Sequence, residues 1–173
     1  SFLNKIYSPR VVDARNIWIM NSITQDVIKH GTGRRALELQ RNDLSGKTGT
    51  TNDQHDAWFS GFNSSIVTVS WVGFDKFKPL GTRETGGRAA LPMWIDYMRE
   101  VLKEMPSSVI QRPKGLVTVR VDSKTGKITN ADNPDAMFEV FRLENAPKSP
   151  NKKKQSDLLL KDDGTIYIPE QLF

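Results

Sequence analysis

Apolar residues near the start of the chain recur at steps of three and four, which is the spacing of one helix face. They are Ile17, Met20, Ile23, Val27 and Ile28. Asp13 precedes them and has the short acceptor side chain that caps helix N-termini. Gly31-Thr32-Gly33 follows, and its two glycines favour a tight, close-packed turn over further helix. The pattern therefore predicts an amphipathic helix from residue 13 to about residue 29.

The next part of the chain changes to short segments rich in β-branched and aromatic residues, which are typical of strands. These segments span residues 44–52, 57–62 and 66–74, and the turn-forming residues 63–65 join the last two as a hairpin. In the third segment apolar and more polar residues alternate, which fits an antiparallel sheet with one better-buried face. The same spacing places four aromatic residues in the core: Trp58, Phe59, Trp71 and Trp94.

A second helix is predicted after the polar, glycine-rich segment 81–88. Pro92 suits the first turn of a helix, and behind it lies an apolar stripe at helical spacing: Trp94, Met98, Val101 and Leu102. This helix should close the domain near residue 105. A helix, three antiparallel strands and a helix together indicate an α+β fold, with an antiparallel sheet flanked by helices, and disfavour parallel βαβ topology.

The apolar pattern is thinner after Pro106. Residues 117–121 alternate like a strand, residues 123–126 are typical of a turn, and residues 138–143 suggest another strand. The proline- and lysine-rich stretch 146–157 cannot bury enough apolar surface to order itself. We therefore predict three parts: the main domain at 1–106, a small β-rich extension at 107–145 and a flexible basic tail at 146–173, in which residues 166–168 dock back.

Composition narrows the function classes without choosing one. The formal net charge of +5 suits an acidic partner such as nucleic acid, anionic lipid or an anionic wall polymer. The absence of cysteine excludes a disulfide framework, a thiolate nucleophile and a cysteine-ligated metal. His30 and His55 are far apart, and zinc sites need three or four ligands, so no metal site is expected. No apolar stretch reaches the roughly 18 residues of a membrane span.

The segment 45–53, Ser-Gly-Lys-Thr-Gly-Thr-Thr-Asn-Asp, is the most informative. A phosphate-binding loop requires G-x-x-x-x-G-K-T, but Arg41 occupies the first glycine position, and no strand–loop–helix order surrounds the motif. The K-T-G strand of penicillin-recognising serine enzymes requires a cation and hydroxyls for a carboxylate, and a glycine for close approach of substrate. These groups are present in Lys47, Thr48, Gly49 and Thr50.

The tripeptide alone is a weak signal, because it recurs at residues 124–126, in a segment that we interpret as a hairpin turn. The surrounding sequence makes the first copy specific. After it come Asp56-Ala57-Trp58-Phe59-Ser60-Gly61-Phe62 and Trp71-Val72-Gly73-Phe74-Asp75, with Gly31-Thr32-Gly33 upstream and Thr85-Gly86-Gly87 and Ala89-Ala90-Leu91-Pro92 downstream. From about residue 11 to residue 105 the chain resembles class A penicillin-binding proteins, nearest to the 1A type of Gram-negative bacteria. The resemblance implies the C-terminal half of a penicillin-binding, serine β-lactamase-like transpeptidase fold.

In that family a serine of an S-x-x-K motif attacks the D-Ala-D-Ala bond of a peptidoglycan stem peptide, and an amine of a neighbouring stem completes the cross-link. Penicillins acylate the same serine. By resemblance, Lys47, Thr48 and Thr50 would bind the carboxylate of the stem peptide or of a β-lactam. The Thr50 backbone N–H would form half of the oxyanion hole, and Gly49 would keep the strand edge open.

The resemblance also implies partners and a location. The partners are the stem peptides of lipid II-derived glycan strands and β-lactam antibiotics, with no cofactor, no metal and no specific nucleic acid. The location is the periplasmic face of the bacterial inner membrane.

The family places S-x-x-K and S-x-N before K-T-G, but neither motif occurs upstream of Lys47. Ser149 begins a match to both, in the proline- and lysine-rich tail on the wrong side of K-T-G, and we interpret this match as accidental. The chain begins at Ser1, as a chain cut from a longer one would. We expect a preceding segment to supply the nucleophile, its lysine, the glycosyltransferase domain and the membrane anchor. Alone, the chain should be inactive.

Two other functions fit parts of the sequence. A serine β-lactamase or a D-Ala-D-Ala carboxypeptidase can also contain K-T-G, but the context at residues 56–59 and the long segment after the second helix favour the transpeptidase. A basic nucleic-acid-binding module would use the net charge, Arg34-Arg35 and the lysines at 152–154. The basic residues are scattered among acidic ones, however, and no RNA-recognition signature is present. His55 is expected at the surface, with a position lining the cleft as the alternative.

Overall fold

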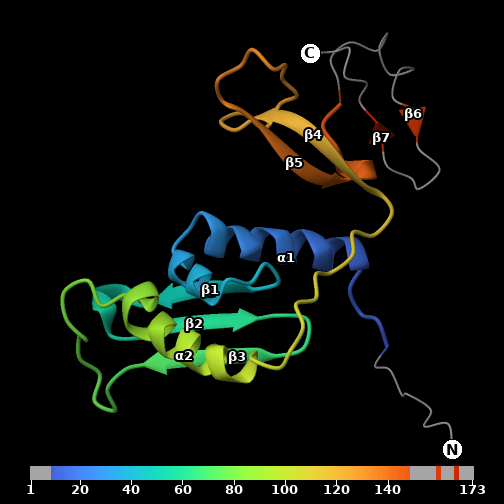
Figure 1. Ribbon diagram of the computed structural model, residues 1–173. Helices are drawn as coiled ribbons and strands as arrows, with labels where there is room; N and C mark the ends of the chain where they lie inside the picture. Colours follow the sequence, from blue (N-terminus) through green and yellow to red (C-terminus); the bar gives the residue numbers. More distant parts are fainter. Residues whose placement is uncertain (1–8, 149–158, 161–165, 168–173) are drawn as a thin grey trace, which may run out of the picture. The chain divides into compact units, whose positions relative to one another are not determined.

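The computed structural model describes residues 9–148 and two short strands, β6 (Leu159–Leu160) and β7 (Ile166–Tyr167), which pair antiparallel (Figure 1). The chain folds as two compact units. The larger unit is Met20–Gln111, and the smaller one contains the described residues before Met20 and after Gln111. The predicted division at residues 106 and 145 stays a prediction, and most of the predicted tail at 146–173 lies outside the described residues.

The larger unit is built on a three-stranded antiparallel sheet in the order β1 (Ser45–Thr50), β2 (Ala57–Phe62) and β3 (Val67–Val72). All three strands lie inside the segments predicted from sequence. The hairpin between β2 and β3 is confirmed too, since Phe62 pairs with Val67. Its turn is closed by the Asn63 side chain, whose Oδ1 accepts the N–H groups of Ser65 and Ile66, each at 2.9 Å.

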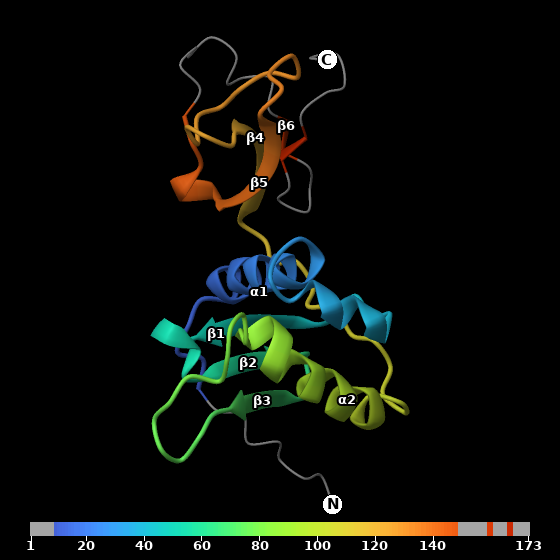
Figure 2. The same ribbon diagram turned by 90° about the vertical axis from the view of Figure 1, so that its left-hand side faces the viewer.

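Helix α2 (Leu91–Val101) follows a single π-helical turn at Gly86–Ala90 and covers one face of the sheet (Figures 1 and 2). Trp94 of α2 is fully buried against Phe59 of β2, and their rings meet edge to face with centroids 4.9 Å apart. Gly61 makes room for this contact, because a Cβ there would lie 2.5 Å from Trp94 Cζ2. The hydrophobic core of the larger unit comprises Ile28, Ala36, Leu44, Ala57, Phe59, Ala90, Leu91, Trp94, Ile95, Met98 and Leu102.

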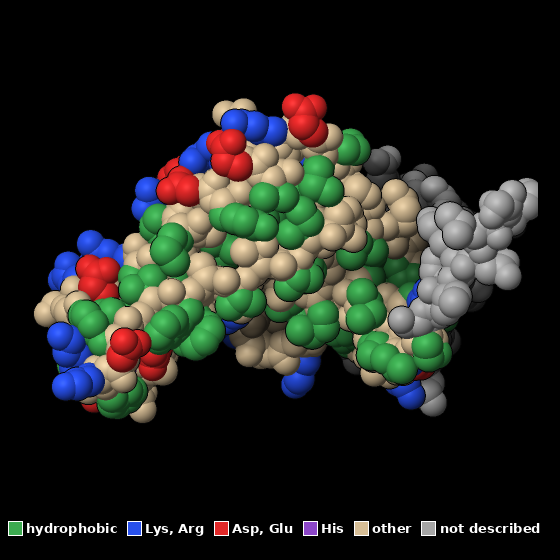
Figure 3. Space-filling model, turned by 90° about the horizontal axis from the view of Figure 1, so that it is seen from below, with side chains coloured by type: hydrophobic (Ala, Val, Ile, Leu, Met, Phe, Trp, Pro, Cys, Tyr) green, Lys and Arg blue, Asp and Glu red, His purple; other side chains and the backbone are tan. Residues whose placement is uncertain are grey.

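The prediction that all four aromatic residues are core was wrong for Trp58 and Trp71, which remain 41% and 43% exposed. Neighbouring strand residues point to opposite faces, so burial of Phe59 against α2 turns Trp58 to the other face. Trp71 is the cross-strand partner of Trp58 and shares that face. Val69 also lies on it and is 53% exposed. Figure 3, seen from below Figure 1, shows many hydrophobic side chains at the surface.

The inward face of β3 is consequently the more polar of its two faces. Ser70 is 8% exposed, and its hydroxyl donates to the Ala90 carbonyl at 2.9 Å. Trp94 Nε1 donates to the Thr68 carbonyl at 3.2 Å on the same face. These hydrogen bonds satisfy polar groups beneath the helix, which allows a serine to occupy a core position.

Helix α1 (Ala14–Lys29) confirms the first predicted helix and its cap. The Arg15 N–H donates to Asp13 Oδ1 at 2.8 Å, and the helix ends just before the predicted glycine turn. Its stripe of apolar residues is only partly buried, because Met20 and Ile23 are 56% and 51% exposed. Its buried residues are Asn21, whose Oδ1 accepts a hydrogen bond from the Ser45 hydroxyl of β1 at 2.8 Å, and Ile28, which belongs to the core of the larger unit.

A buried ion pair anchors the segment that enters β1. Arg41 Nη2 lies 2.7 Å from Asp43 Oδ2, and the Asp43 side chain is fully buried. Arg41 also donates to the Met105 carbonyl at 2.7 Å, and the Ser108 N–H donates to Asp43 at 3.1 Å. Burial by itself raises the pKa of Asp43, but the hydrogen bonds from Arg41 and Ser108 outweigh it and lower the pKa below its ordinary value. The segment after α2 is thus fastened to the start of β1.

The smaller unit contains the antiparallel pair β4 (Leu116–Asp122) and β5 (Ala136–Arg142). The intervening residues 123–126 form the predicted turn, where Asp122 Oδ1 accepts the N–H groups of Lys124 and Thr125 at 3.0 and 2.8 Å. Hydrogen bonds from Asn133 and Thr125 lower the pKa of Asp122 to about 2. The second Lys-Thr-Gly copy is therefore a turn fastened by a carboxylate, as the sequence predicted.

Replacing Phe59 with Ala should open a cavity between β2 and α2. We expect the free energy of unfolding, measured by urea denaturation of this chain, to fall by about 3–5 kcal/mol. Trp58→Ala is the matched control, because it also removes an aromatic ring but from the exposed face. It should lower the free energy of unfolding by only about 1 kcal/mol. Equal losses would contradict the assignment of the two sheet faces.

Candidate functional site

The predicted site residues lie on β1, which is an edge strand of the sheet within the described chain, since it pairs with β2 on one side only. The register places Lys47 opposite Ser60, Thr48 opposite Phe59 and Gly49 opposite Trp58. An edge strand has a row of backbone N–H and C=O groups that no neighbouring strand uses. Such a row can accept an extended peptide.

The hydrogen-bond phase of the sheet determines which N–H groups point to that edge. The Thr51 N–H donates to the Asp56 carbonyl at 3.1 Å, across the pairing of β1 with β2. In an antiparallel ladder the N–H direction alternates from residue to residue. The Gly49 N–H therefore points toward β2, whereas those of Thr48 and Thr50 point away from it. The backbone donor predicted for an oxyanion hole is thus directed to the free edge.

Lys47 and Thr48 extend from opposite faces of β1. Lys47 is exposed, and its ammonium donates to the Thr48 carbonyl at 2.8 Å. It makes no ion pair with any described carboxylate, so its positive charge is not neutralised within this part of the chain. The Thr48 hydroxyl oxygen lies 2.6 Å from that of Thr32, in the glycine turn after α1.

Thr50 links the strand to the turn before α2. Its Oγ1 accepts the Gly86 N–H at 3.0 Å. A Cβ on Gly86 would lie 2.2 Å from the Trp58 carbonyl oxygen and 2.5 Å from that of Gly49. A Cβ on Gly87 would lie 2.8 Å from the Thr32 carbonyl oxygen. Both glycines thus allow this turn to pack directly on main chain, and they bring Thr32, β1 and the start of α2 together.

The turn that follows β1 is tightly formed. Asp53 and Gln54 both have left-handed backbone conformations, with φ of 55° and 56°. His55 Nδ1–H donates to the Asn52 carbonyl at 2.9 Å, and the His55 ring stacks on Phe77, with ring centroids 3.9 Å apart. His55 is half-buried by this stack. Its predicted place at the surface, with a position lining the cleft as the alternative, stays a prediction.

Comparison with known proteins identifies this arrangement. No family model matches the chain. It is 54% identical over 143 residues to penicillin-binding protein 1A of Pseudomonas aeruginosa, which covers 83% of the chain and 17% of that protein. It is 49% identical over 111 residues to penicillin-binding protein 1A of Neisseria gonorrhoeae, which covers 64% of the chain and 14% of that protein. The chain belongs to the penicillin-binding protein 1A family.

A solved member of the family has the same fold. The crystal structure of penicillin-binding protein 1A from Haemophilus influenzae matches with a TM-score of 0.74 and 32% identity, over 83% of this chain and 22% of that one. This confirms the predicted α+β class, an antiparallel sheet flanked by helices. The chain spans about a sixth (17%) of the length of the Pseudomonas protein.

Within this penicillin-binding protein 1A region, the sequence prediction identified the residues of β1 but missed their contacts. The sequence predicts Gly31-Thr32-Gly33 as a helix-ending turn and Gly86 and Gly87 as part of a polar, glycine-rich segment, but it does not predict that these segments contact β1. The available signal was their composition, because both segments combine a threonine with two glycines in a tight turn. The roles predicted for Lys47 and Thr50 toward substrate stay predictions.

Three other features that the sequence analysis considered are a second serine motif, a metal site and a membrane span. Ser149 lies outside the described residues. In the described part of the chain, no group of three or more histidine, aspartate or glutamate side chains is placed to hold a metal ion. None of the described helices is long and apolar enough to cross a membrane.

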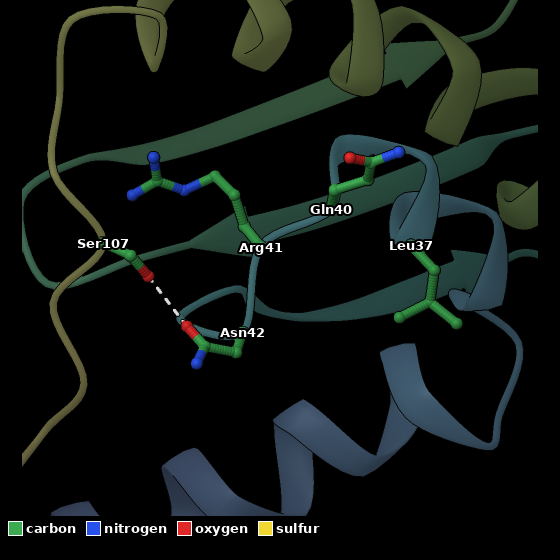
Figure 4. Close-up of a pocket in the computed structure, with 5 residues that line it drawn as sticks. All are labelled: Leu37, Gln40, Arg41, Asn42 and Ser107. Carbon is green, nitrogen blue, oxygen red and sulfur yellow. Dashed lines mark hydrogen bonds between the residues drawn. The ribbon is translucent and has the colours of Figure 1, made fainter.

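One surface hollow of about 420 Å³ is lined by Leu37, Gln40, Arg41, Asn42 and Ser107 (Figure 4). Ser107 donates to Asn42 Oδ1 at 2.8 Å across it, and the Arg41 guanidinium is already bonded to Asp43. None of the lining residues belongs to β1. The hollow is therefore separate from the K-T-G strand.

Replacing Gly86 with Ala should force the turn before α2 away from β1, because the new Cβ would overlap two carbonyl oxygens. We expect the free energy of unfolding to fall by about 2 kcal/mol or more, measured by urea denaturation. Arg88→Ala, an exposed position in the same π-helical turn, is the control and should change it by less than about 0.5 kcal/mol. A neutral Gly86→Ala variant would contradict the close approach.

Proposed function

We propose that this chain supplies the carboxylate-binding strand of a penicillin-sensitive D-Ala-D-Ala transpeptidase that takes part in peptidoglycan synthesis. The observation that supports the proposal most is the free edge of β1, where the Lys47 ammonium, the Thr48 hydroxyl and the outward Thr50 N–H occur within one short strand. A cation and a hydroxyl suit an anionic carboxylate. The N–H suits the oxygen that becomes negatively charged during acyl transfer. Membership of the penicillin-binding protein 1A family gives the same expectation.

The reaction proceeds through a serine acyl-enzyme. The serine hydroxyl, on a segment that precedes this chain, attacks the carbonyl carbon between the two D-alanines and gives its proton to the adjacent lysine. The carbon–nitrogen bond breaks, and the terminal D-alanine leaves with that proton on its amine. An amine of a second stem peptide then attacks the ester, forms the new amide and returns a proton to the serine. Two easier acyl transfers replace one difficult one.

Four residues of β1, Lys47 to Thr50, each have a part in these steps. Lys47 and Thr48, with the Thr50 side chain, hold the carboxylate of the terminal D-alanine. The Thr50 N–H stabilises the oxyanion of both tetrahedral intermediates, and removing such a donor typically costs about 2.7–4 kcal/mol of transition-state stabilisation. Gly49 lets the substrate backbone approach the edge.

The same strand accounts for inhibition by β-lactams. Their carboxylate takes the place of the D-alanine carboxylate, and the serine opens the strained lactam amide. The amine that is released stays tethered to the acyl group, so the adduct persists. The proposed partners are therefore stem peptides of glycan strands and β-lactam antibiotics. Membership of the penicillin-binding protein 1A family supports the proposed location, which is the cell envelope at the periplasmic face of the inner membrane.

The test uses a chimeric enzyme in which this chain replaces the matched region of Pseudomonas aeruginosa penicillin-binding protein 1A. Benzylpenicillin should add one covalent adduct to the chimera, detected by intact mass, and none to the isolated chain. Lys47→Ala should lower the second-order rate constant of acylation at least about tenfold, because a charge-assisted hydrogen bond to the carboxylate is lost.

Lys124→Ala is the matched control, because it alters the second Lys-Thr-Gly copy, which is a turn, and it should leave the acylation rate unchanged. An effect of Lys124→Ala equal to that of Lys47→Ala would refute the assignment to β1. Rapid release of penicilloate by the chimera, in place of a long-lived adduct, would indicate a β-lactamase.

A further inference from the structure

The shortest side-chain contact of the K-T-G strand is with a residue outside it. Thr32 Oγ1 lies 2.6 Å from Thr48 Oγ1, and one hydroxyl must donate to the other. We propose that Thr32 is a positioning residue, whose hydroxyl donates to Thr48 and so directs the Thr48 proton toward the bound carboxylate. The inference rests on the proposed function of the strand, because it concerns how Thr48 recognises an anion.

The direction of this hydrogen bond decides what Thr48 can do. A threonine hydroxyl has one proton and can accept two hydrogen bonds. If Thr48 donates to Thr32, its proton is already used and its lone pairs repel an anion. If Thr32 donates to Thr48, the Thr48 proton is free for the carboxylate, and the donated bond polarises it further. A bound carboxylate therefore selects the second direction.

The backbone around Thr32 is held in place, so the hydroxyl occupies a fixed position. The N–H groups of Gly31 and Gly33 both donate to the Val27 carbonyl at the end of α1, at 3.1 and 2.9 Å. On the other side, the Thr32 carbonyl oxygen is where a Cβ on Gly87 would collide, at 2.8 Å. Thr32 is thus held between the end of α1 and the turn before α2, and glycine main chain makes the contact on each side.

A purely structural role for Thr32 makes a different prediction. If the hydroxyl pair only fastened α1 to β1, its loss would disturb the whole strand, including the Thr50 N–H and Lys47. Acylation would then slow for every β-lactam. If Thr32 orients the Thr48 proton, its loss should affect only ligands that present a carboxylate to Thr48.

The experiment measures second-order acylation rate constants of the chimeric enzyme with benzylpenicillin and with its uncharged methyl ester. Thr32→Val keeps the shape of the side chain and removes the hydroxyl, and it should slow acylation by benzylpenicillin about fivefold. Acylation by the methyl ester should change by less than about twofold. Thr32→Ser keeps the hydroxyl and should restore the benzylpenicillin rate to within about twofold of the unaltered chimera.

A double-mutant cycle with Thr48→Val completes the test. In that background Thr32→Val should cause no further loss, because the hydroxyl it orients is gone. Equal slowing with both ligands, failure of Thr32→Ser to restore the rate, or independent effects in the double mutant would each overturn the inference.

These outcomes are separable from failure of the proposed function. An unaltered chimera that melts like its parent but gains no penicillin adduct refutes the proposed function itself. An unaltered chimera that reacts normally and is insensitive to Thr32→Val refutes only the role of Thr32. Thermal unfolding midpoints of all variants, matched to that of the unaltered chimera, show that rate changes do not reflect misfolding.

Discussion

The antiparallel pairing of β1 with β2 determines most features of the candidate site, and the hydrogen bond from the Thr51 N–H to the Asp56 carbonyl shows its phase. It turns the N–H groups of Thr48 and Thr50 to the free edge. The pairing of Thr48 with Phe59 also places the Thr48 side chain on the face covered by α2. A slip of one residue would exchange the two faces and turn the Thr50 N–H inward. The pairing of β1 with β2 therefore fixes both the faces of the strand's side chains and the directions of its N–H groups.

Glycines provide the second constraint, because they let the turn before α2 approach both the sheet and the turn after α1 more closely than any side chain would permit. Gly86 packs on the carbonyl oxygens of Trp58 and Gly49, and Gly87 packs on that of Thr32. The hydrogen bond from the Gly86 N–H to Thr50 then fastens the start of α2 to the strand. As a result, segments that are distant in sequence hold the hydroxyls of Thr48 and Thr50 in place.

The sequence was sufficient to predict the helices, the strands of the main sheet and the family of the chain. Those features depend on local periodicity and on a motif whose neighbours are specific. It was misleading for Trp58 and Trp71, because apolar character indicates a face suited to burial but does not say which face a helix covers. Ser70 shows the converse, since a serine is buried where the π-helical turn before α2 offers the Ala90 carbonyl as an acceptor.

The contact of Thr32 with Thr48 could not be predicted, because it joins the turn after α1 to strand β1, and their separation depends on tertiary packing. A motif identifies chemical groups within a strand, whereas an orienting partner can come from any segment that folds against it. The left-handed conformation of Gln54 likewise has no sequence signal, whereas Asp53 is a residue type that tolerates this conformation.

A crystal structure of the benzylpenicillin adduct of the chimeric enzyme tests the central claim most directly. The account predicts that the β-lactam carboxylate lies within about 3 Å of the Thr48 hydroxyl and close to the Lys47 ammonium, and that the ester carbonyl oxygen accepts the Thr50 N–H. An adduct whose carboxylate faces solvent, with the edge of β1 unoccupied, would contradict it.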